Sequence, residues 1–147
     1  TVEEFRPVLE AMGSKVFHLG PRGSGSRMKL VNNLVAAANL AALSEGLALG
    51  EAAGIPAEKQ LEVFMTGAAA SRLAELKGEK VSTRSHDPQF KLSHMVKDLR
   101  YALDLGYGLE QALPLTALVS QVYTAGLREH GDDDISAVSE VSRRSPR

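Results

Sequence analysis

A lysine and two asparagines stand together at the start of the longest apolar stretch of the sequence. Lys29 and Asn33 are four positions apart, so on a helix they would share one face, with Asn32 adjoining them. An amine can give or take a proton during a reaction, and an amide beside it can hold a polar substrate. Burial would disfavour the charged form of the lysine and so favour such a role. The alternative is that Lys29 reaches solvent and the asparagines only tie helices together.

One long helix and a glycine-rich turn would position these residues. Residues 28–53 are rich in Ala, Leu and Val and contain no proline, which predicts a single helix. Either Ser24 or Ser26 could cap its start, and a glycine-rich turn over residues 20–25 would precede it. The apolar residues fall on several faces, so we expect the helix to be buried. The polar residues within it argue against a membrane span.

The rest of the chain is also predicted to be mainly helical. Apolar spacing and Gly or Pro boundaries predict helices over residues 2–12, 56–66, 68–76, 90–105, 114–130 and 135–141. Residues 15–19 are expected to form a short strand and residues 77–88 a polar loop. Alanine and leucine dominate an apolar fraction of 44%, with only 5% aromatic residues, which favours helix packing. The predicted fold class is therefore all-α, a helical bundle around one long buried helix.

Charge and composition exclude several function classes. The net charge of −1 and the pI near 6.4 supply no general attraction to nucleic acid or to a membrane surface. The absence of cysteine excludes disulfides and thiolate chemistry. The four histidines are far apart, and only His94 and Asp98 have a loose ligand-like spacing, so no metal site is expected. The chain opens without Met and without a visible signal peptide, which suggests a fragment or a processed chain.

Two motifs resemble those of a known family. The pattern Gly20-x-x-Gly23-x-Gly25-x-x-x-Lys29-x-x-Asn32-Asn33 resembles the catalytic segment of the β-hydroxyacid dehydrogenases, which include 3-hydroxyisobutyrate dehydrogenase and tartronate semialdehyde reductase. Residues 90–99 are similar to a second motif of that family, and the likeness covers essentially the whole chain. The related 6-phosphogluconate dehydrogenase shares the layout but has His-Asn in place of Asn32-Asn33, which argues against sugar-phosphate chemistry.

The resemblance implies a domain organisation. Residues 1–20 would be the terminal helix and strand of a Rossmann domain that binds NAD or NADP, and the rest of that domain is not in this sequence. Residues 21–141 would be the all-helical catalytic and dimerisation domain, and residues 142–147 a disordered tail. The implied protein is a cytoplasmic homodimer or homotetramer that interconverts a small β-hydroxyacid and its semialdehyde. The chain by itself is expected to be inactive.

The resemblance also implies roles for single residues. Lys29 would be the catalytic acid or base. The residues expected to bind substrate are Gly25, Asn32 and Asn33, and those expected to reach the cofactor are Phe90 and Lys97. Asp98 would be structural.

A second function class competes with the enzyme. The long apolar helix would also suit a non-catalytic dimerisation module that lacks a cofactor domain. Neither hypothesis includes a nucleic-acid or membrane partner.

Overall fold

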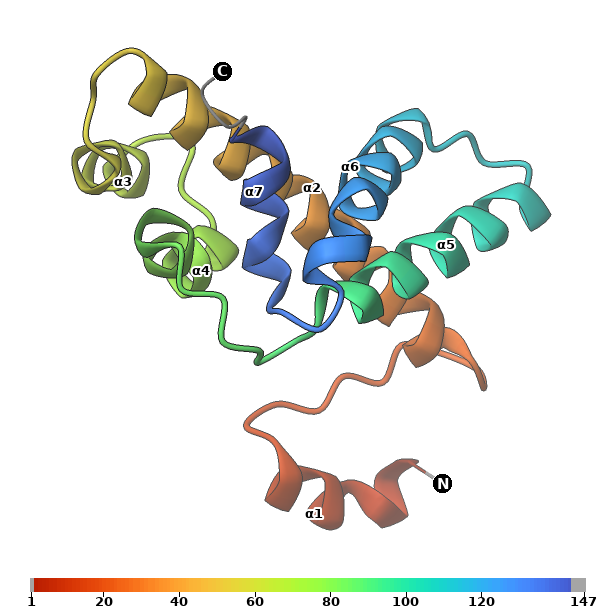
Figure 1. Ribbon diagram of the computed structural model, residues 1–147. Coiled ribbons are helices and arrows are strands. Elements are labelled where there is room, and N and C mark those ends of the chain that lie inside the picture. The colour runs from red at the N-terminus through yellow and green to blue at the C-terminus, as the bar shows by residue number, and fades with distance from the viewer. Residues whose placement is uncertain (1, 144–147) are drawn as a thin grey trace.

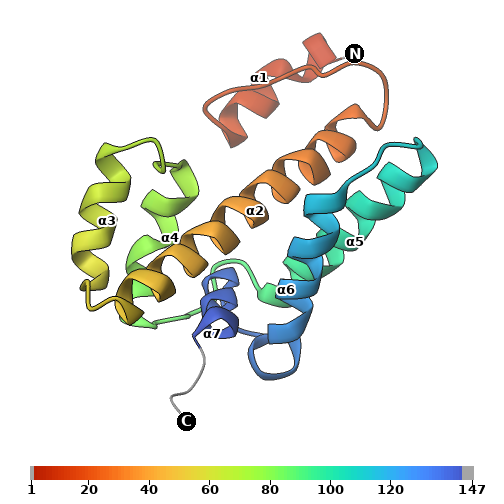
Figure 2. The same ribbon diagram turned by 90° about the horizontal axis from the view of Figure 1, so that it is seen from above.

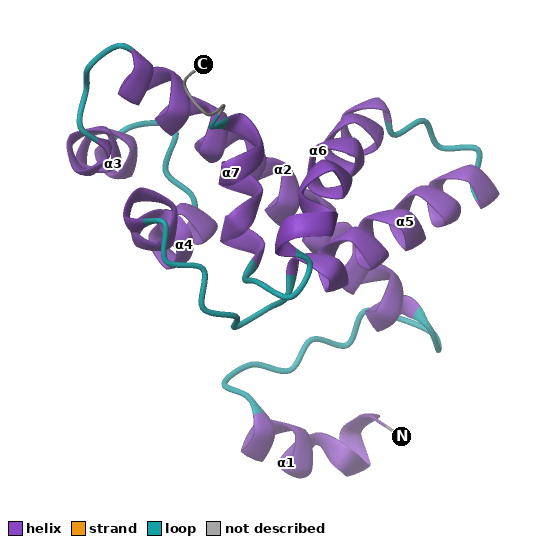
Figure 3. Cartoon of the chain, in the orientation of Figure 1, coloured by secondary structure: helices purple, strands orange, loops and turns teal. Residues whose placement is uncertain are grey.

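The computed structural model describes residues 2–143, and every regular element within them is helical (Figures 1 and 3). The all-α prediction is therefore confirmed. The elements are α1 (Val2–Met12), α2 (Ser24–Ala52), α3 (Ala57–Thr66), α4 (Arg72–Thr83), α5 (Leu92–Gly108), α6 (Pro114–His130), the 3-10 helix η1 (Ile135–Val138) and α7 (Ser139–Ser142).

The long helix α2 packs against α3, α4, α5, α6, α7 and η1. In Figure 2 it runs diagonally, with α3 and α4 on one side and α5 and α6 on the other. Tyr123 of α6 is fully buried, and its hydroxyl donates a hydrogen bond to the carbonyl oxygen of Ala37 in α2 (3.3 Å). Leu92, Met95 and Leu99 of α5 complete the same core. The fold thus holds α2 and α5 side by side, which matters for the site.

Burial of α2 is uneven along its length. Its buried residues begin at Ala37 and continue to Leu47, whereas Val31 and Val35 nearer the start are exposed. The expectation of a helix buried along its whole length is therefore wrong for the first half, because no described element packs over that face. By length and composition alone, α2 could cross a membrane. This is weak evidence for a membrane span, because the core helices of soluble proteins pass the same test.

The start of α2 also differs from the prediction. The N-cap is Gly23, with φ at +96°, and no side chain caps the helix. Ser24 and Ser26 lie inside the first turn instead. Glycine adopts a left-handed backbone without steric strain. Gly23 therefore forms the turn that starts α2, and the predicted serine cap is wrong.

The predicted strand over residues 15–19 is wrong for this chain. These residues form an irregular connection between α1 and α2, and no strand occurs within residues 2–143. A strand needs a neighbouring strand to pair its backbone groups, and the described chain offers none.

The region after α3 holds the largest boundary error. A helix over 68–76 and a loop over 77–88 were predicted, but α4 begins at Arg72 and continues to Thr83. Ser71 caps it by accepting a hydrogen bond from the backbone N–H of Ala74 (3.0 Å). Residues 77–83 of the predicted loop belong to α4, where Lys77 is buried in an ion pair, and residues 84–88 lie in the connection that follows.

The later boundaries follow the prediction more closely. α6 begins at Pro114 and ends before Gly131, as expected. α5 begins at Leu92, two residues later than predicted, and runs through Gly106 and Gly108.

The C-terminal segment is more ordered than predicted. Residues 135–141 form η1 and most of α7, and the Asp134 carboxylate caps η1 by accepting from the Ser136 N–H. The disordered tail was placed over 142–147, but Ser142 closes α7 and Arg143 pairs with Glu51 (3.0 Å). The remainder of that tail lies outside the described residues.

Candidate active site

The lysine and one asparagine converge on a single carboxylate. Lys29 Nζ lies 2.8 Å from Oδ2 of Asp98, and the Asn33 Nδ2 donates to the same oxygen at 2.8 Å. Lys29 and Asn33 come from α2, one helical turn apart, and Asp98 comes from α5. The side chain of Asp98 is only 2% exposed, so the carboxylate is a buried anchor for both partners.

Electrostatics favour the ionised form of Asp98. Burial raises the pKa of Asp98, but hydrogen bonds from Lys29 and Asn33 and the charges of Lys29 and Lys97 outweigh it, and the pKa lies below its usual value. The carboxylate therefore remains negative beside the Lys29 ammonium. Such a pair holds the amine in one direction instead of leaving it on a free flexible stem.

Lys29 itself is not buried. Its side chain is 56% exposed, so the expectation of a desolvated lysine is wrong for the described chain. Asp98 holds the amine on one side, and more than half of the Lys29 side chain remains open to solvent. An amine in this position can reach a group that arrives from outside the helical bundle.

The residues expected to meet the cofactor lie on or beside α5. Lys97 is half exposed, and its Nζ lies 3.7 Å from the other oxygen of Asp98. Phe90 precedes α5 and packs edge-on against the ring of His94, with 5.9 Å between the ring centroids. Lys97 thus joins the Lys29–Asp98 cluster, whereas Phe90 contacts a different neighbour.

Asn32 and Gly25 are less engaged. The Asn32 amide makes a long hydrogen bond (3.4 Å) to the Asn33 side chain and is otherwise exposed. Gly25 lies in the first turn of α2, and a methyl group added there would meet no atom within 4 Å. Both residues therefore lie near the start of α2, and the contacts described for them contribute little to the packing of the fold.

A second buried carboxylate fixes the start of α5. Asp134 Oδ2 accepts from Lys77 Nζ (2.8 Å) and from the backbone N–H groups of Gln89 (3.0 Å) and Phe90 (3.2 Å). Lys77 Nζ also donates to the Gln89 side chain (2.9 Å). The turn that carries Phe90 is therefore tied to α4 and η1, and α5 starts from a fixed point.

Sequence reasoning missed the roles of both carboxylates. Asp98 was given a structural role, yet it contacts the two polar residues singled out on α2. Its spacing from Met95 and Ala102, which places it on the buried apolar face of α5, was the available signal. Asp134 was expected only to cap a helix, and nothing local in the sequence indicates its pairing with Lys77 across the fold.

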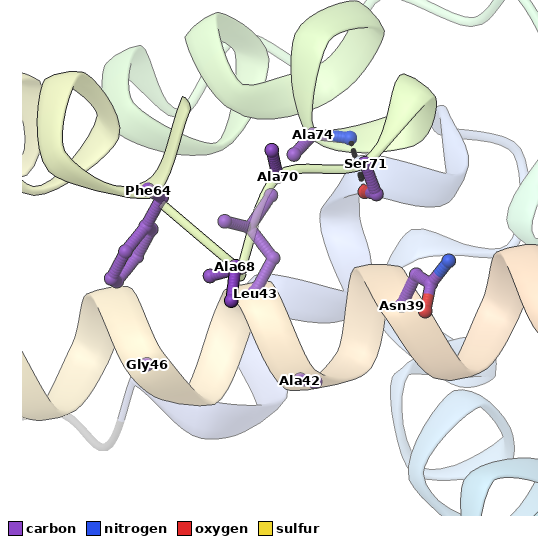
Figure 4. Close-up of a pocket in the computed structure, with 10 residues that line it drawn as sticks. Asn39, Ala42, Leu43, Gly46, Phe64, Ala68, Ala70, Ser71 and Ala74 are labelled. Carbon is purple, nitrogen blue, oxygen red and sulfur yellow. Dashed lines mark hydrogen bonds between the residues drawn. The ribbon is translucent and has the colours of Figure 1, made fainter. Parts of the chain in front are cut away.

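A cavity of about 460 Å³ lies elsewhere, between α2 and the α3–α4 connection (Figure 4). Its walls are mainly apolar and include Leu43 of α2, Phe64 of α3 and Ala74 of α4. It contains no ionisable side chain, so it offers no proton chemistry. Within residues 2–143 no group of three His, Asp or Glu side chains could hold a metal ion.

Comparison with known proteins gives one family. Residues 23–142 match the family model described as "NAD-binding of NADP-dependent 3-hydroxyisobutyrate dehydrogenase". The chain is 38% identical over 135 residues to a probable 3-hydroxyisobutyrate dehydrogenase-like 1, mitochondrial, from Arabidopsis thaliana, covering 92% of this chain and 40% of that protein. It is equally identical over 137 residues to the cytokine-like nuclear factor N-PAC of Aedes aegypti, covering 92% of this chain and 24% of that protein.

Solved structures agree with the family match. The crystal structure of 3-hydroxyisobutyrate dehydrogenase from Salmonella typhimurium is 30% identical, with a TM-score of 0.90 over 95% of this chain and 50% of that chain. The chain thus spans half or less of these relatives. The resemblance noted in the two motifs is confirmed, as is NAD(P) as the cofactor of the family. The chain belongs to the NAD-binding 3-hydroxyisobutyrate dehydrogenase family.

Proposed function

We propose that this chain is the helical domain of an NAD(P)-dependent oxidoreductase that interconverts a small β-hydroxyacid and its semialdehyde, with Lys29 as proton donor and acceptor. The observation that carries the proposal is the shared contact of Lys29 and Asn33 with the buried Asp98 carboxylate. It fixes the direction of an exposed amine, which is what a general acid or base needs.

The proton chemistry of the proposal follows from the amine. In aldehyde reduction the Lys29 ammonium polarises the carbonyl oxygen and gives a proton to the alkoxide that forms. In alcohol oxidation the neutral amine takes the hydroxyl proton. Asn33 lies one turn further along α2 and can hold the substrate's oxygen or carboxylate, with Asn32 and Gly25 at the same open end.

The cofactor, when bound, supplies or accepts the hydride. Lys97 fits a place near it, because its ammonium is half exposed and stands next to the Lys29–Asp98 pair. Phe90 adds an aromatic surface at the start of α5, which the Asp134 carboxylate holds in place. These two residues would contribute binding and orientation, and the main cofactor contacts would come from a preceding domain.

We propose the same domain division as the motifs imply. Residues 1–20 would be the end of the preceding Rossmann domain, and residues 21–141 the helical domain. The support is the apolar face of α1, where Phe5, Val8 and Met12 are all more than half exposed. Such a face needs a partner surface, and α1 buries no residue against the helical bundle.

The compartment and the assembly also stay predictions. We expect a cytoplasmic protein, whereas the names of two Arabidopsis thaliana relatives include the words mitochondrial and chloroplastic. A homodimer or homotetramer is still our expectation.

The test uses the full-length protein that carries this chain. It is incubated with NADH or NADPH and a panel of small semialdehydes, and turnover is followed by the loss of reduced cofactor. We expect turnover of at least one of them, and a fall of about a thousandfold or more in Lys29→Ala. Lys59→Ala removes a surface lysine paired only with Glu62 and should leave turnover unchanged. Equal turnover in wild type and Lys29→Ala would remove Lys29 from the chemistry, whereas no turnover of any semialdehyde by the wild type would favour the non-catalytic dimerisation module.

A further inference from the structure

The residues between α4 and α5 form no helix, yet their backbone is held along its length. We call residues 86–91 the Phe90 segment. The Asp134 N–H donates to the carbonyl oxygen of His86 (2.8 Å), and the Ile135 N–H donates to that of Phe90 (2.9 Å). Figure 1 shows the two parts of the chain passing each other below α7. The residues that lead into η1 therefore fix the path of the backbone that carries Phe90.

The Asp134 side chain adds to this backbone pairing. One carboxylate oxygen accepts from the N–H groups of Gln89 (3.0 Å) and Phe90 (3.2 Å) and from Lys77 Nζ (2.8 Å). The other oxygen accepts from the Ser136 N–H (3.1 Å) in η1. Both backbone groups of Phe90, its N–H and its carbonyl oxygen, are thus held by two consecutive residues.

His86 anchors the other end of the Phe90 segment through its ring. Nδ1 lies 2.9 Å from the Ser136 hydroxyl oxygen, and Nε2 lies 3.1 Å from a carboxylate oxygen of Glu140. The ring is only 10% exposed. Arg84, which follows α4, pairs with the same carboxylate. Side chains from η1 and α7 thus hold the start of the segment, and Asp134 holds its end.

Stability alone does not explain a charged pair at this position. Lys77 and Asp134 are both buried. Breaking such a pair is costly because one charge is left unpaired, yet two apolar residues of similar size are often as stable as the intact pair. Apolar side chains, however, could not accept from the N–H groups of Gln89 and Phe90. The carboxylate supplies that acceptor, and the Lys77 ammonium compensates its charge so that the acceptor can be buried.

We propose that Lys77 and Asp134 are positioning residues for the nicotinamide cofactor, acting through Phe90. They fix the backbone of Phe90, and with it the direction of a half-buried ring that can meet the cofactor. His86 supports them as the second anchor of the Phe90 segment. The inference rests on the place given to Phe90 in the proposed function, but it does not depend on proton transfer by Lys29.

Direct cofactor binding to the full-length protein tests the inference without any need for turnover. NADH and NADPH are titrated, and their fluorescence gives the dissociation constant. Asp134→Asn keeps the size of the side chain but gives up one of the two acceptor oxygens, and we expect it to raise the dissociation constant about tenfold. His86→Ala leaves the buried pair intact, so it is the safer variant for folding, and it should raise the constant about threefold.

A double variant separates positioning from stability. Lys77→Met/Asp134→Leu leaves no charge buried and unpaired, so its free energy of unfolding should stay close to that of the wild type. Its dissociation constant should still be raised about tenfold, because neither new side chain can accept from the Phe90 N–H. Gln60→Ala is the matched control, since it removes a buried polar side chain of α3 that donates to two backbone carbonyl oxygens. It should lower stability and leave the dissociation constant unchanged.

A double-mutant cycle and amide hydrogen exchange test the route through Phe90. In the Phe90→Ala protein, Asp134→Asn should raise the dissociation constant by less than about twofold further, because the side chain that Asp134 positions is gone. In the cofactor-free protein, Asp134→Asn should speed exchange in peptides that cover residues 86–91 more than in peptides of α3. This second measurement needs no bound cofactor.

Four results would overturn the inference. One is a stable Lys77→Met/Asp134→Leu protein that binds cofactor as tightly as the wild type. Another is an equal effect of Asp134→Asn with and without the Phe90 ring. A third is a rise in the dissociation constant of Gln60→Ala as large as that of Asp134→Asn, and the fourth is a wild-type protein that binds neither NADH nor NADPH. Cofactor binding that responds to the variants, without turnover of any semialdehyde, would support this inference and count against the proposed function.

Discussion

Lys29 of α2 and Asp98 of α5 meet with 2.8 Å between the ammonium nitrogen and one carboxylate oxygen, although one is half exposed and the other is buried. The pair joins the two helices at the open end of the bundle. Because Asp98 also accepts from Asn33, a single oxygen fixes both polar side chains of α2. The position of Asp98 on α5 therefore decides where the amine of α2 points.

Replacing Asp98 by asparagine tests that dependence. Asp98→Asn keeps the size of the side chain but removes the negative charge beside Lys29, so the ammonium loses both its anchor and its electrostatic support. We expect kcat of the full-length protein to fall about ten- to a hundredfold while KM changes less.

Asp104→Asn is the matched control, since Asp104 is an exposed residue of the same helix. It should leave both kcat and KM unchanged. If Asp98→Asn behaved like this control, Asp98 would have no part in orienting Lys29.

The two asparagines should differ when each is replaced by alanine. Asn33→Ala removes a hydrogen bond to a buried carboxylate and should lower the free energy of unfolding by about 1–3 kcal/mol. Asn32→Ala removes only a long, exposed contact and should change stability by less than about 0.5 kcal/mol. Thermal or urea unfolding of the two variants measures the difference. If Asn32→Ala is as stable as the wild type, a change in its KM in steady-state kinetics would show that Asn32 contributes to substrate binding.

The sequence predicted the helical class and the shared face of Lys29 and Asn33 on α2, because spacing along a helix is a local property. It predicted α6 well for the same reason, since Pro114 and Gly131 mark its ends. It could not predict that Lys77 belongs to a buried pair, because its partner Asp134 is brought near only by the packing of α4 against η1. The failed strand over residues 15–19 has a similar cause: strand pairing depends on residues outside the local segment.

The Lys77–Asp134 pair should be a major source of stability. Lys77→Met leaves a fully buried carboxylate without its cation, and we expect the free energy of unfolding to fall by about 3–5 kcal/mol. Lys91→Met is the matched control, because Lys91 pairs with Asp132, whose side chain is 91% exposed. It should cost less than about 1 kcal/mol. Equal losses in urea unfolding of the two variants would contradict the difference in burial.

The same pair predicts how stability depends on pH. Burial raises the pKa of Asp134, but hydrogen bonds from Lys77 and from the backbone N–H groups of Gln89, Ser136 and Phe90 bring it below its usual value. The unfolded chain therefore binds this proton more readily, so the contribution of Asp134 is present above the ordinary aspartate pKa of about 3.9 and is lost as pH falls through the lowered value. Urea unfolding from pH 6 downward should show a steeper acid loss in wild type than in Asp134→Asn.

Two glycines of α5 provide a test of how closely α5 approaches the α5–α6 connection. A Cβ added at Gly106 would lie 2.6 Å from Leu113 Cδ1 and 3.1 Å from the carbonyl oxygen of Gln111, whereas one added at Gly108 would meet nothing within 4 Å. Alanine is the better helix former by about 1 kcal/mol, so Gly108→Ala should be neutral or slightly stabilising. Gly106→Ala gains the same propensity but forces the connection to move, and we expect a net loss of about 1–3 kcal/mol. If the contact is as close as described, the two substitutions should change the melting temperature in opposite directions in thermal unfolding. A stabilised Gly106→Ala would show that this connection lies further from α5.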